Sequence, residues 1–192
     1  MNVKLVSYSA PTDEWADEGL DNLQDLIAFC AKVSNPSAQI NSATSEKLLN
    51  YLVKHQHWSP FEMVSACLEI ETTRDIAHQI VRHRSFAFQE FSQRYANPKE
   101  MGDMFEYAEA RLQDTKNRQN SIPTENVQLI HEWTDVQDQV IAATKKAYDW
   151  AIENGIAKEQ ARKVLPEGLT KTRLYMNGTI RSWIHYIDLR GA

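Results

Sequence analysis

The spacing of apolar residues along the chain predicts an irregular succession of helices and strands. Apolar residues recur three and four apart over several stretches, which is the repeat of a helix that buries one face. The pattern predicts helices over about 17–33, 73–84, 123–153, 157–164 and 180–187, and one that runs from the 42–45 region toward 55. Runs rich in β-branched residues predict strands over 3–8, 64–72 and 169–175. Separated helices and strands of this kind are typical of an α+β fold.

Two of these helices have a clear apolar stripe. The stripe of the first consists of Leu20, Leu23, Ile27 and Cys30, so its acidic residues are expected to face outward. The stripe of the long helix consists of Val127, Ile130, Thr134, Ile141, Tyr148 and Ile152. We expect Pro123 in its first turn and Asn154-Gly155 at its end. The polar residues 97–126 predict a mobile excursion from the core.

The composition of the 192-residue chain favours one domain with a real core, because 42% of its residues are hydrophobic. A formal charge of −5 disfavours a general binder of nucleic acids or anionic membranes. The two cysteines, Cys30 and Cys67, cannot supply a disulfide framework or a cysteine-rich metal site. No apolar run approaches the ~18 to 20 residues that cross a bilayer. We therefore expect a soluble, untargeted, cytoplasmic protein.

Arginines are concentrated in one stretch of this acidic chain. Within residues 74–94 lie four of the ten arginines, namely Arg74, Arg82, Arg84 and Arg94. Together with Asp75 and Glu90 they give the stretch a net charge of +2. Such a charge suits a confined pocket for a phosphorylated small molecule, whereas the alternative is a helix end exposed to water.

Local geometry would gather polar side chains from this stretch. On a helix, Gln79 lies three residues before Arg82 and four before His83, so the three side chains share one face. An extended segment after residue 89 would align the carboxylate, hydroxyl and guanidinium of Glu90, Ser92 and Arg94. Guanidinium groups suit phosphates, and a carboxylate accepts hydrogen bonds from ribose hydroxyls. The stretch therefore predicts a nucleotide site.

The spacing of Arg82-His83-Arg84 and Ser92 resembles the signature of the flavin-dependent thymidylate synthases. Four further blocks resemble segments of that family and occur in the same order. They are Ala31–Ser34, Lys54–Glu62, Ala161–Pro166 and Arg181–Arg190. The blocks cover most of residues 31–95 and 157–190, which makes the resemblance specific.

The resemblance implies the reductive methylation of dUMP to dTMP. Members of that family take the carbon from methylenetetrahydrofolate and the hydride from FAD that NADPH has reduced. It also implies a central, mostly antiparallel sheet flanked by helices, and a homotetramer with active sites shared between subunits. No metal and no cysteine nucleophile are needed, which agrees with the absence of a base or cationic cluster beside either cysteine in the sequence.

Matching positions imply two overlapping sets of binding residues. The FAD set consists of Ser59, Arg82, His83, Arg84, Glu90, Thr179, Arg181 and His185. The dUMP set consists of Gln79, Arg82, Glu90, Ser92, Gln93, Arg94, Arg162 and Arg190. Arg190 matches the arginine that favours ionisation of the uracil at N3, so it is the expected catalytic residue. His57 would lie near the flavin or folate entrance.

Three positions depart from the family pattern. Gln93 stands where many members have Gly, and Thr179 stands where many have Asn. The chain ends at Gly191-Ala192, whereas members usually continue through another helix, so we expect a chain that is short at its C-terminus.

Other classes of function remain open from the sequence. A flavin- or dUMP-binding protein without turnover would keep both binding sets and lack the chemistry. A single-stranded nucleic-acid binder could stack bases on the aromatic residues between Arg82 and Tyr95, although the net charge counts against it. A metal site on His55 and His57 lacks a third ligand in the sequence.

Overall fold

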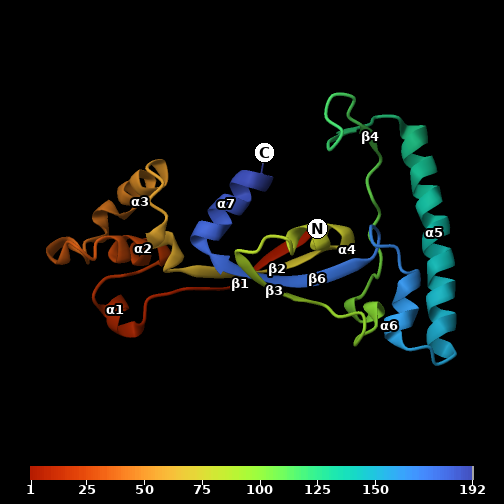
Figure 1. Cartoon of the computed structure of the whole chain (residues 1–192), viewed down its shortest axis with the longest axis horizontal. Helices are drawn as coiled ribbons and strands as arrows, with labels where there is room; N and C mark the ends of the chain where they lie inside the picture. Colours follow the sequence, from red (N-terminus) through yellow and green to blue (C-terminus); the bar gives the residue numbers. More distant parts are fainter. Residues whose placement is uncertain (192) are drawn as a thin grey trace. The chain divides into compact units, whose positions relative to one another are not determined.

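The computed structural model describes residues 1–191 and has an α+β fold (Figure 1). The chain divides into two compact units. The first unit comprises Met1, Glu71–Ile80 and Glu90–Arg173. The second unit comprises Asn2–Ile70, Val81–Gln89 and the residues from Leu174 onward.

A four-stranded antiparallel sheet has the strand order β1-β2-β6-β3. Its strands are β1 (Asn2–Tyr8), β2 (Ser65–Thr73), β3 (Phe86–Glu90) and β6 (Lys171–Thr179). The strands predicted over 3–8, 64–72 and 169–175 are confirmed, although β6 begins later and continues to Thr179. Strands β2, β3 and β6 each contribute residues to both units.

The core of the second unit is built around Ile27, Leu52, Phe61 and Val64. Its helices are α1 (Asp13–Asp17), α2 (Leu23–Ala31), α3 (Ser45–Lys54) and α7 (Ile180–Arg190), with the 3-10 turns η1 (Pro36–Ala38), η2 (Ser42–Thr44) and η3 (Ser59–Glu62). The helix predicted from the 42–45 region toward 55 and the helix predicted over 180–187 are confirmed. Ile180 and Ile184 of α7 pack against the core, whereas Ile187 near the end of the same helix is exposed.

The single helix predicted over 17–33 is wrong, because α1 ends at Asp17 and only α2 lies within that range. Between them Gly19 adopts a positive φ of 97°. The Asn22 side chain then accepts a hydrogen bond from the backbone N–H of Asp25 at 3.0 Å, and this N-cap sets the start of α2. Asp25 is buried and accepts from Nδ2 of Asn22 at 2.9 Å, so the expectation of outward-facing acids fails there. Cys30, expected in the core, is half-buried.

The core of the first unit lies along the long helix α5 (Val127–Glu153). The other elements of this unit are α4 (Arg74–Ile80), η4 (Pro98–Met101), β4 (Arg111–Gln113), β5 (Ser121–Pro123), α6 (Lys158–Ala161) and η5 (Arg162–Val164). The core residues are Met104, Phe105, Ile141, Tyr148, Ala151, Ala161 and Leu165. Neither α5 nor any other helix in the described residues is apolar enough over sufficient length to span a membrane.

Several details of the first unit differ from the sequence predictions. α5 ends at the predicted place, with Gly155 at a φ of 72°, but Pro123 lies in β5 and Asn126 caps the helix. The first two members of the predicted stripe, Val127 and Ile130, are exposed because core contacts begin further along the helix. The segment 97–126 is only partly an excursion, since it supplies Met104 and Phe105 to the core.

Candidate functional site

The Arg82-His83-Arg84 segment lies in a turn and not on a helix. α4 ends at Ile80, so the prediction that Gln79, Arg82 and His83 share one helix face is wrong. β3 begins at Phe86, whose ring packs against Trp183 with the ring centroids 4.7 Å apart. Because the chain must reverse before this anchored residue, the helix cannot continue to residue 84.

Glycine is required opposite Phe86. A Cβ atom on Gly178 of β6 would overlap the Phe86 ring. The close approach of ring and backbone fixes the beginning of β3, and with it the end of the arginine-rich turn.

Arg82 and Arg84 present exposed guanidinium groups. Neither has an ion-pair or hydrogen-bond partner for its side chain among residues 1–191. The same is true of the exposed Arg94 and the half-buried Arg162 in the first unit. Each guanidinium carries five N–H donors, so these side chains are available to phosphate oxygens.

His83 lies beside Arg190 in the second unit. Nε of Arg190 donates to Nε2 of His83 at 3.3 Å, and the Tyr186 ring is edge-on to the imidazole with the centroids 4.8 Å apart. An accepting Nε2 requires a neutral imidazole with its proton on Nδ1. Burial, together with the positive charge of Arg190, lowers the pKa of His83 below its ordinary value. At neutral pH the pair therefore consists of a charged Arg190 and an uncharged His83.

We expect the Arg190→Ala variant to raise the pKa of His83 toward the ordinary histidine value of ~6.5. The rise should be partial, because burial contributes more to the lowering than the charge does. In the wild type the folded state loses stability as the pH falls from ~6.5 to the folded pKa of His83, and the variant should lose less. NMR titration of the imidazole measures this. Identical titration of His83 in both proteins would contradict the contact.

Three residues of the predicted FAD set already have structural partners in the second unit. Oγ1 of Thr179 caps α7 by accepting from a backbone N–H in its first turn at 3.3 Å. Arg181 forms an ion pair with Glu62. His185 lies edge-on to the Trp58 ring, with the centroids 4.6 Å apart. These contacts fix the orientation of the three side chains along one helix.

Ser59 begins η3 and is exposed. It lines a pocket of about 460 Å³, with Cys30 and Met63 among the other walls. Burial raises the pKa of the Cys30 thiol, so the thiol stays protonated at neutral pH and is a poor nucleophile. His57, predicted near a cofactor entrance, is exposed and lies edge-on to Tyr51 with the ring centroids 6.1 Å apart.

The residues after Glu90 form a turn in the first unit. The Ser92 carbonyl accepts from the backbone N–H groups of Tyr95 and Ala96 at 3.0 and 2.9 Å. The prediction that an extended segment aligns Glu90, Ser92 and Arg94 is therefore wrong, because extended pairing ends at residue 91. Ser92 and Arg94 are exposed, whereas Gln93 is only 2% exposed. Nε2 of Gln93 has no hydrogen-bond partner among the described residues.

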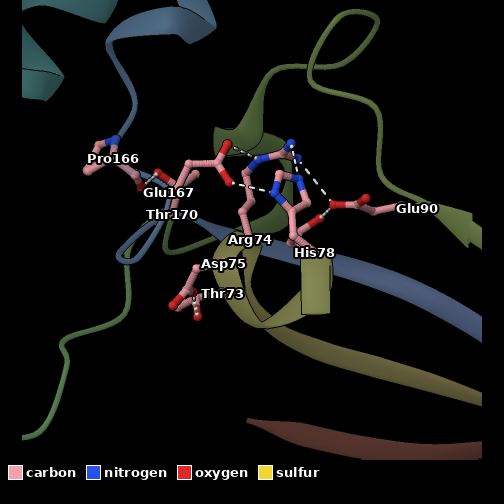
Figure 2. Close-up of polar contacts among 9 residues, drawn as sticks. Thr73, Arg74, Asp75, His78, Glu90, Pro166, Glu167 and Thr170 are labelled. Carbon is pink, nitrogen blue, oxygen red and sulfur yellow. Dashed lines mark hydrogen bonds and ion pairs between the residues drawn. The ribbon is translucent and has the colours of Figure 1, made fainter. Parts of the chain in front are cut away.

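The Glu90 carboxylate is fixed by two donors in the first unit. Nη1 of Arg74 donates to its Oε1 at 3.2 Å, and the Thr172 hydroxyl donates to the same oxygen at 2.9 Å. Figure 2 shows the Arg74 guanidinium between Glu90 on one side and Glu167 on the other, with His78 beside it. The sequence pattern counted Arg74 among the clustered arginines without a role, and no spacing pointed to Thr172 or Glu167. These contacts join residues far apart along the chain.

The predicted binding residues are divided between the two units. The first unit holds Gln79, Glu90, Ser92, Gln93, Arg94 and Arg162. The second unit holds Ser59, Arg82, His83, Arg84, Thr179, Arg181, His185 and Arg190. Gln79 is exposed at the end of α4, and Arg162 begins η5. That all of them line one cavity stays a prediction.

Comparison with known proteins gives consistent matches over nearly the whole chain. Residues 18–192 match the family model described as thymidylate synthase complementing protein. A probable flavin-dependent thymidylate synthase of Paramecium bursaria Chlorella virus 1 is 48% identical over 190 residues, which cover 99% of this chain and 84% of the viral protein. A flavin-dependent thymidylate synthase of Synechocystis sp. is 46% identical over 190 residues, covering 99% of this chain and 85% of that protein.

A solved structure has the same fold. The crystal structure of a UMP/dUMP methylase, PolB from Streptomyces cacaoi, bound with 5-Br dUMP, aligns with a TM-score of 0.77. The alignment covers 97% of this chain and 76% of that chain at 24% sequence identity.

Proposed function

The chain belongs to the thymidylate synthase complementing protein family, and we propose that it catalyses the reductive methylation of dUMP to dTMP. Methylenetetrahydrofolate supplies the carbon, and NADPH supplies the reducing equivalents. The observation that carries this proposal is the 48% and 46% identity, over 99% of the chain, to proteins named for this activity. The unpaired guanidinium groups of the signature segment support it, because both FAD and dUMP are anionic.

The residues of the second unit fit a flavin dinucleotide. Arg82 and Arg84 are exposed and keep all their side-chain donors free among the described residues, as a diphosphate requires. The full proposed FAD set is Ser59, Arg82, His83, Arg84, Glu90, Thr179, Arg181 and His185. When bound, FAD supplies the hydride that completes the methyl group.

Arg94 and Arg162 of the first unit are the proposed phosphate ligands for dUMP. Both side chains lack a partner among residues 1–191, and Ser92, two residues before Arg94, is exposed and offers its hydroxyl as a further donor. Gln79, Arg82, Glu90, Gln93 and Arg190 complete the proposed dUMP set. Ser92 serves as a donor and not as a nucleophile, because no base forms a hydrogen bond with its side chain among the residues that the structure describes.

Arg190 is the proposed catalytic residue. Nε of Arg190 donates to His83. The two terminal nitrogens of Arg190 have no partner among the described residues and remain free to contact a uracil. A fixed cation at that point stabilises the negative charge that develops as the ring loses its N3 proton. Because His83 is neutral, Arg190 is the only charged member of this pair beside the uracil ring.

We also propose that the chain is one family domain that assembles as a homotetramer. In the second unit every residue of β1 is exposed, including Val3, Leu5 and Val6. In the first unit Trp133, Val136 and Val140 are exposed at helical spacing along α5. Apolar surfaces of this kind mark contacts between proteins.

The proposed compartment is the cytoplasm. The free thiols of Cys30 and Cys67 suit its reducing conditions.

A tritium-release assay with 5-tritiated dUMP tests the proposed function. The complete mixture of FAD-loaded protein, methylenetetrahydrofolate and NADPH should release tritium from C5 and form dTMP. Omission of NADPH or of the folate should abolish dTMP formation. Bound FAD with neither release nor dTMP would instead establish a flavin- and dUMP-binding protein without turnover. Salt-dependent RNA binding by a protein that retains no flavin would favour the nucleic-acid class.

A further inference from the structure

Arg74 occupies the centre of a polar network in the first unit. Its side chain is only 12% exposed, and it lies between two carboxylates (Figure 2). Nη1 donates to Oε1 of Glu90 at 3.2 Å, and Nε donates to Oε1 of Glu167 at 3.5 Å. A guanidinium is a rigid planar fork, so contacts from two of its nitrogens fix the direction of both carboxylates.

Two further contacts hold Arg74 itself in place. Its backbone N–H donates to the carbonyl of Thr170 at 3.0 Å. Nη2 lies 3.3 Å from Nε2 of His78, and Nδ1 of the same ring lies 3.0 Å from Oε2 of Glu167. Because a guanidinium nitrogen can only donate, Nε2 of His78 accepts and its Nδ1 donates to Glu167. Arg74 is therefore oriented from both its backbone and its tip.

The two oxygens of Glu90 have different surroundings. Oε1 accepts from Arg74 and from the hydroxyl of Thr172, a residue that is completely buried. Oε2 has no hydrogen-bond donor among residues 1–191. The arrangement ties one oxygen to the protein and leaves the other, on a half-buried side chain, open to a ligand.

We propose that Arg74 is a positioning residue for dUMP: it holds Glu90 so that the free oxygen accepts a hydrogen bond from the 3′-hydroxyl of the deoxyribose. This inference rests on the proposed function, which places Glu90 in the dUMP set. Arg74 does not touch the substrate and acts through Glu90. Its loss frees the carboxylate to rotate, so the sugar contact is weakened. The flavin keeps the other seven residues of its proposed set, and the reacting ring keeps Arg190.

The test compares dUMP with 2′,3′-dideoxyUMP, which lacks only the 3′-hydroxyl. Calorimetry on the FAD-loaded wild type should show about tenfold weaker binding of the dideoxynucleotide, the usual effect of losing a hydrogen bond to a charged group. In Arg74→Ala the dissociation constant for dUMP should rise about tenfold and the preference for dUMP should disappear. KM for dUMP should rise with it, while kcat and the flavin content change less than about twofold. Arg111→Ala is the matched control, since Arg111 is an ion-paired arginine of the same unit with no proposed role.

A double-mutant cycle separates positioning from simple stabilisation. If Arg74 acts through Glu90, Arg74→Ala should have no further effect on dUMP affinity in a Glu90→Ala background. Arg74→Lys, which keeps the charge without the fork, and Thr172→Val, which removes the second donor to Oε1, should each lose part of the preference. These two variants decide the question if Arg74→Ala does not fold.

The outcomes distinguish this inference from the proposed function. A wild type that binds no dUMP overturns both. Normal binding of dUMP by the wild type, with an unchanged preference in the Arg74 and Thr172 variants, overturns only the positioning role. Additive effects of Arg74→Ala and Glu90→Ala also overturn it, because additivity means that the two residues act separately.

Discussion

Replacement of Arg190 by alanine is expected to lower kcat by about a hundredfold to a thousandfold while the protein keeps its FAD. The free terminal N–H groups of Arg190 are the proposed stabilisers of negative charge on the uracil. The partner of Arg190, His83, is uncharged and adds no positive charge of its own. Loss of a fixed donor at the point where charge develops acts on the transition state more than on binding, so KM for dUMP should change less than kcat. Steady-state kinetics and the flavin absorbance of the purified variant measure the two effects.

Arg118→Ala is the control for this experiment. Arg118 is exposed, belongs to the turn between β4 and β5, and has no proposed contact with either nucleotide. Its variant should retain wild-type kcat and flavin. A wild-type rate in Arg190→Ala would show that the catalytic charge comes from another residue.

The Arg82→Ala variant is expected to lose affinity for FAD and for dUMP together. Arg82 belongs to both proposed sets, and its exposed guanidinium has no structural partner among the described residues. Its removal should therefore cost little stability, while each lost charge-assisted hydrogen bond weakens binding by about tenfold or more. Flavin content after purification, calorimetry with dUMP and the thermal midpoint measure the three quantities.

The thermal midpoint of the Arg82→Ala variant shows whether weaker binding comes from lost ligand contacts or from a less stable fold. A variant that melts with the wild type but is purified without flavin supports direct ligand contacts. Retention of FAD with normal dUMP affinity would remove Arg82 from both sets. Arg84→Ala offers a comparison on the same turn, because Arg84 belongs only to the proposed FAD set and its variant should bind dUMP normally once FAD is supplied.

Local patterns predicted the regular elements well where one face of the element is buried. The helix α3 and the strand β2 follow their apolar repeats closely. The apolar pattern predicted the wrong element where a helix cap or a turn ends a helix within the apolar repeat. The cap formed by Asn22 divides the first predicted helix, and the anchoring of Phe86 ends α4 before the arginines. Apolar periodicity contains no information about either event.

The candidate site came almost wholly from ordered motifs, and the structure adds the contacts between them. The pairing of Arg190 with His83 spans more than a hundred residues, and that of Arg74 with Glu90 joins a helix to the end of a strand. Such pairs follow from the order of strands in the sheet, which no local repeat encodes. The predicted alignment of Gln79, Arg82 and His83 required a helix that continues to residue 84. It is wrong because α4 ends at Ile80.

The visible absorbance spectrum of the purified protein during a titration with dUMP tests whether FAD and dUMP occupy one site. If guanidinium groups hold FAD and dUMP against each other in one site, the protein is yellow and its flavin bands shift as dUMP is added, with saturation at one dUMP per flavin. The Arg82→Ala protein should show no such shift. A colourless protein that cannot be loaded with FAD, or a flavin spectrum that dUMP leaves unchanged at saturation, would contradict a shared site for the two nucleotides.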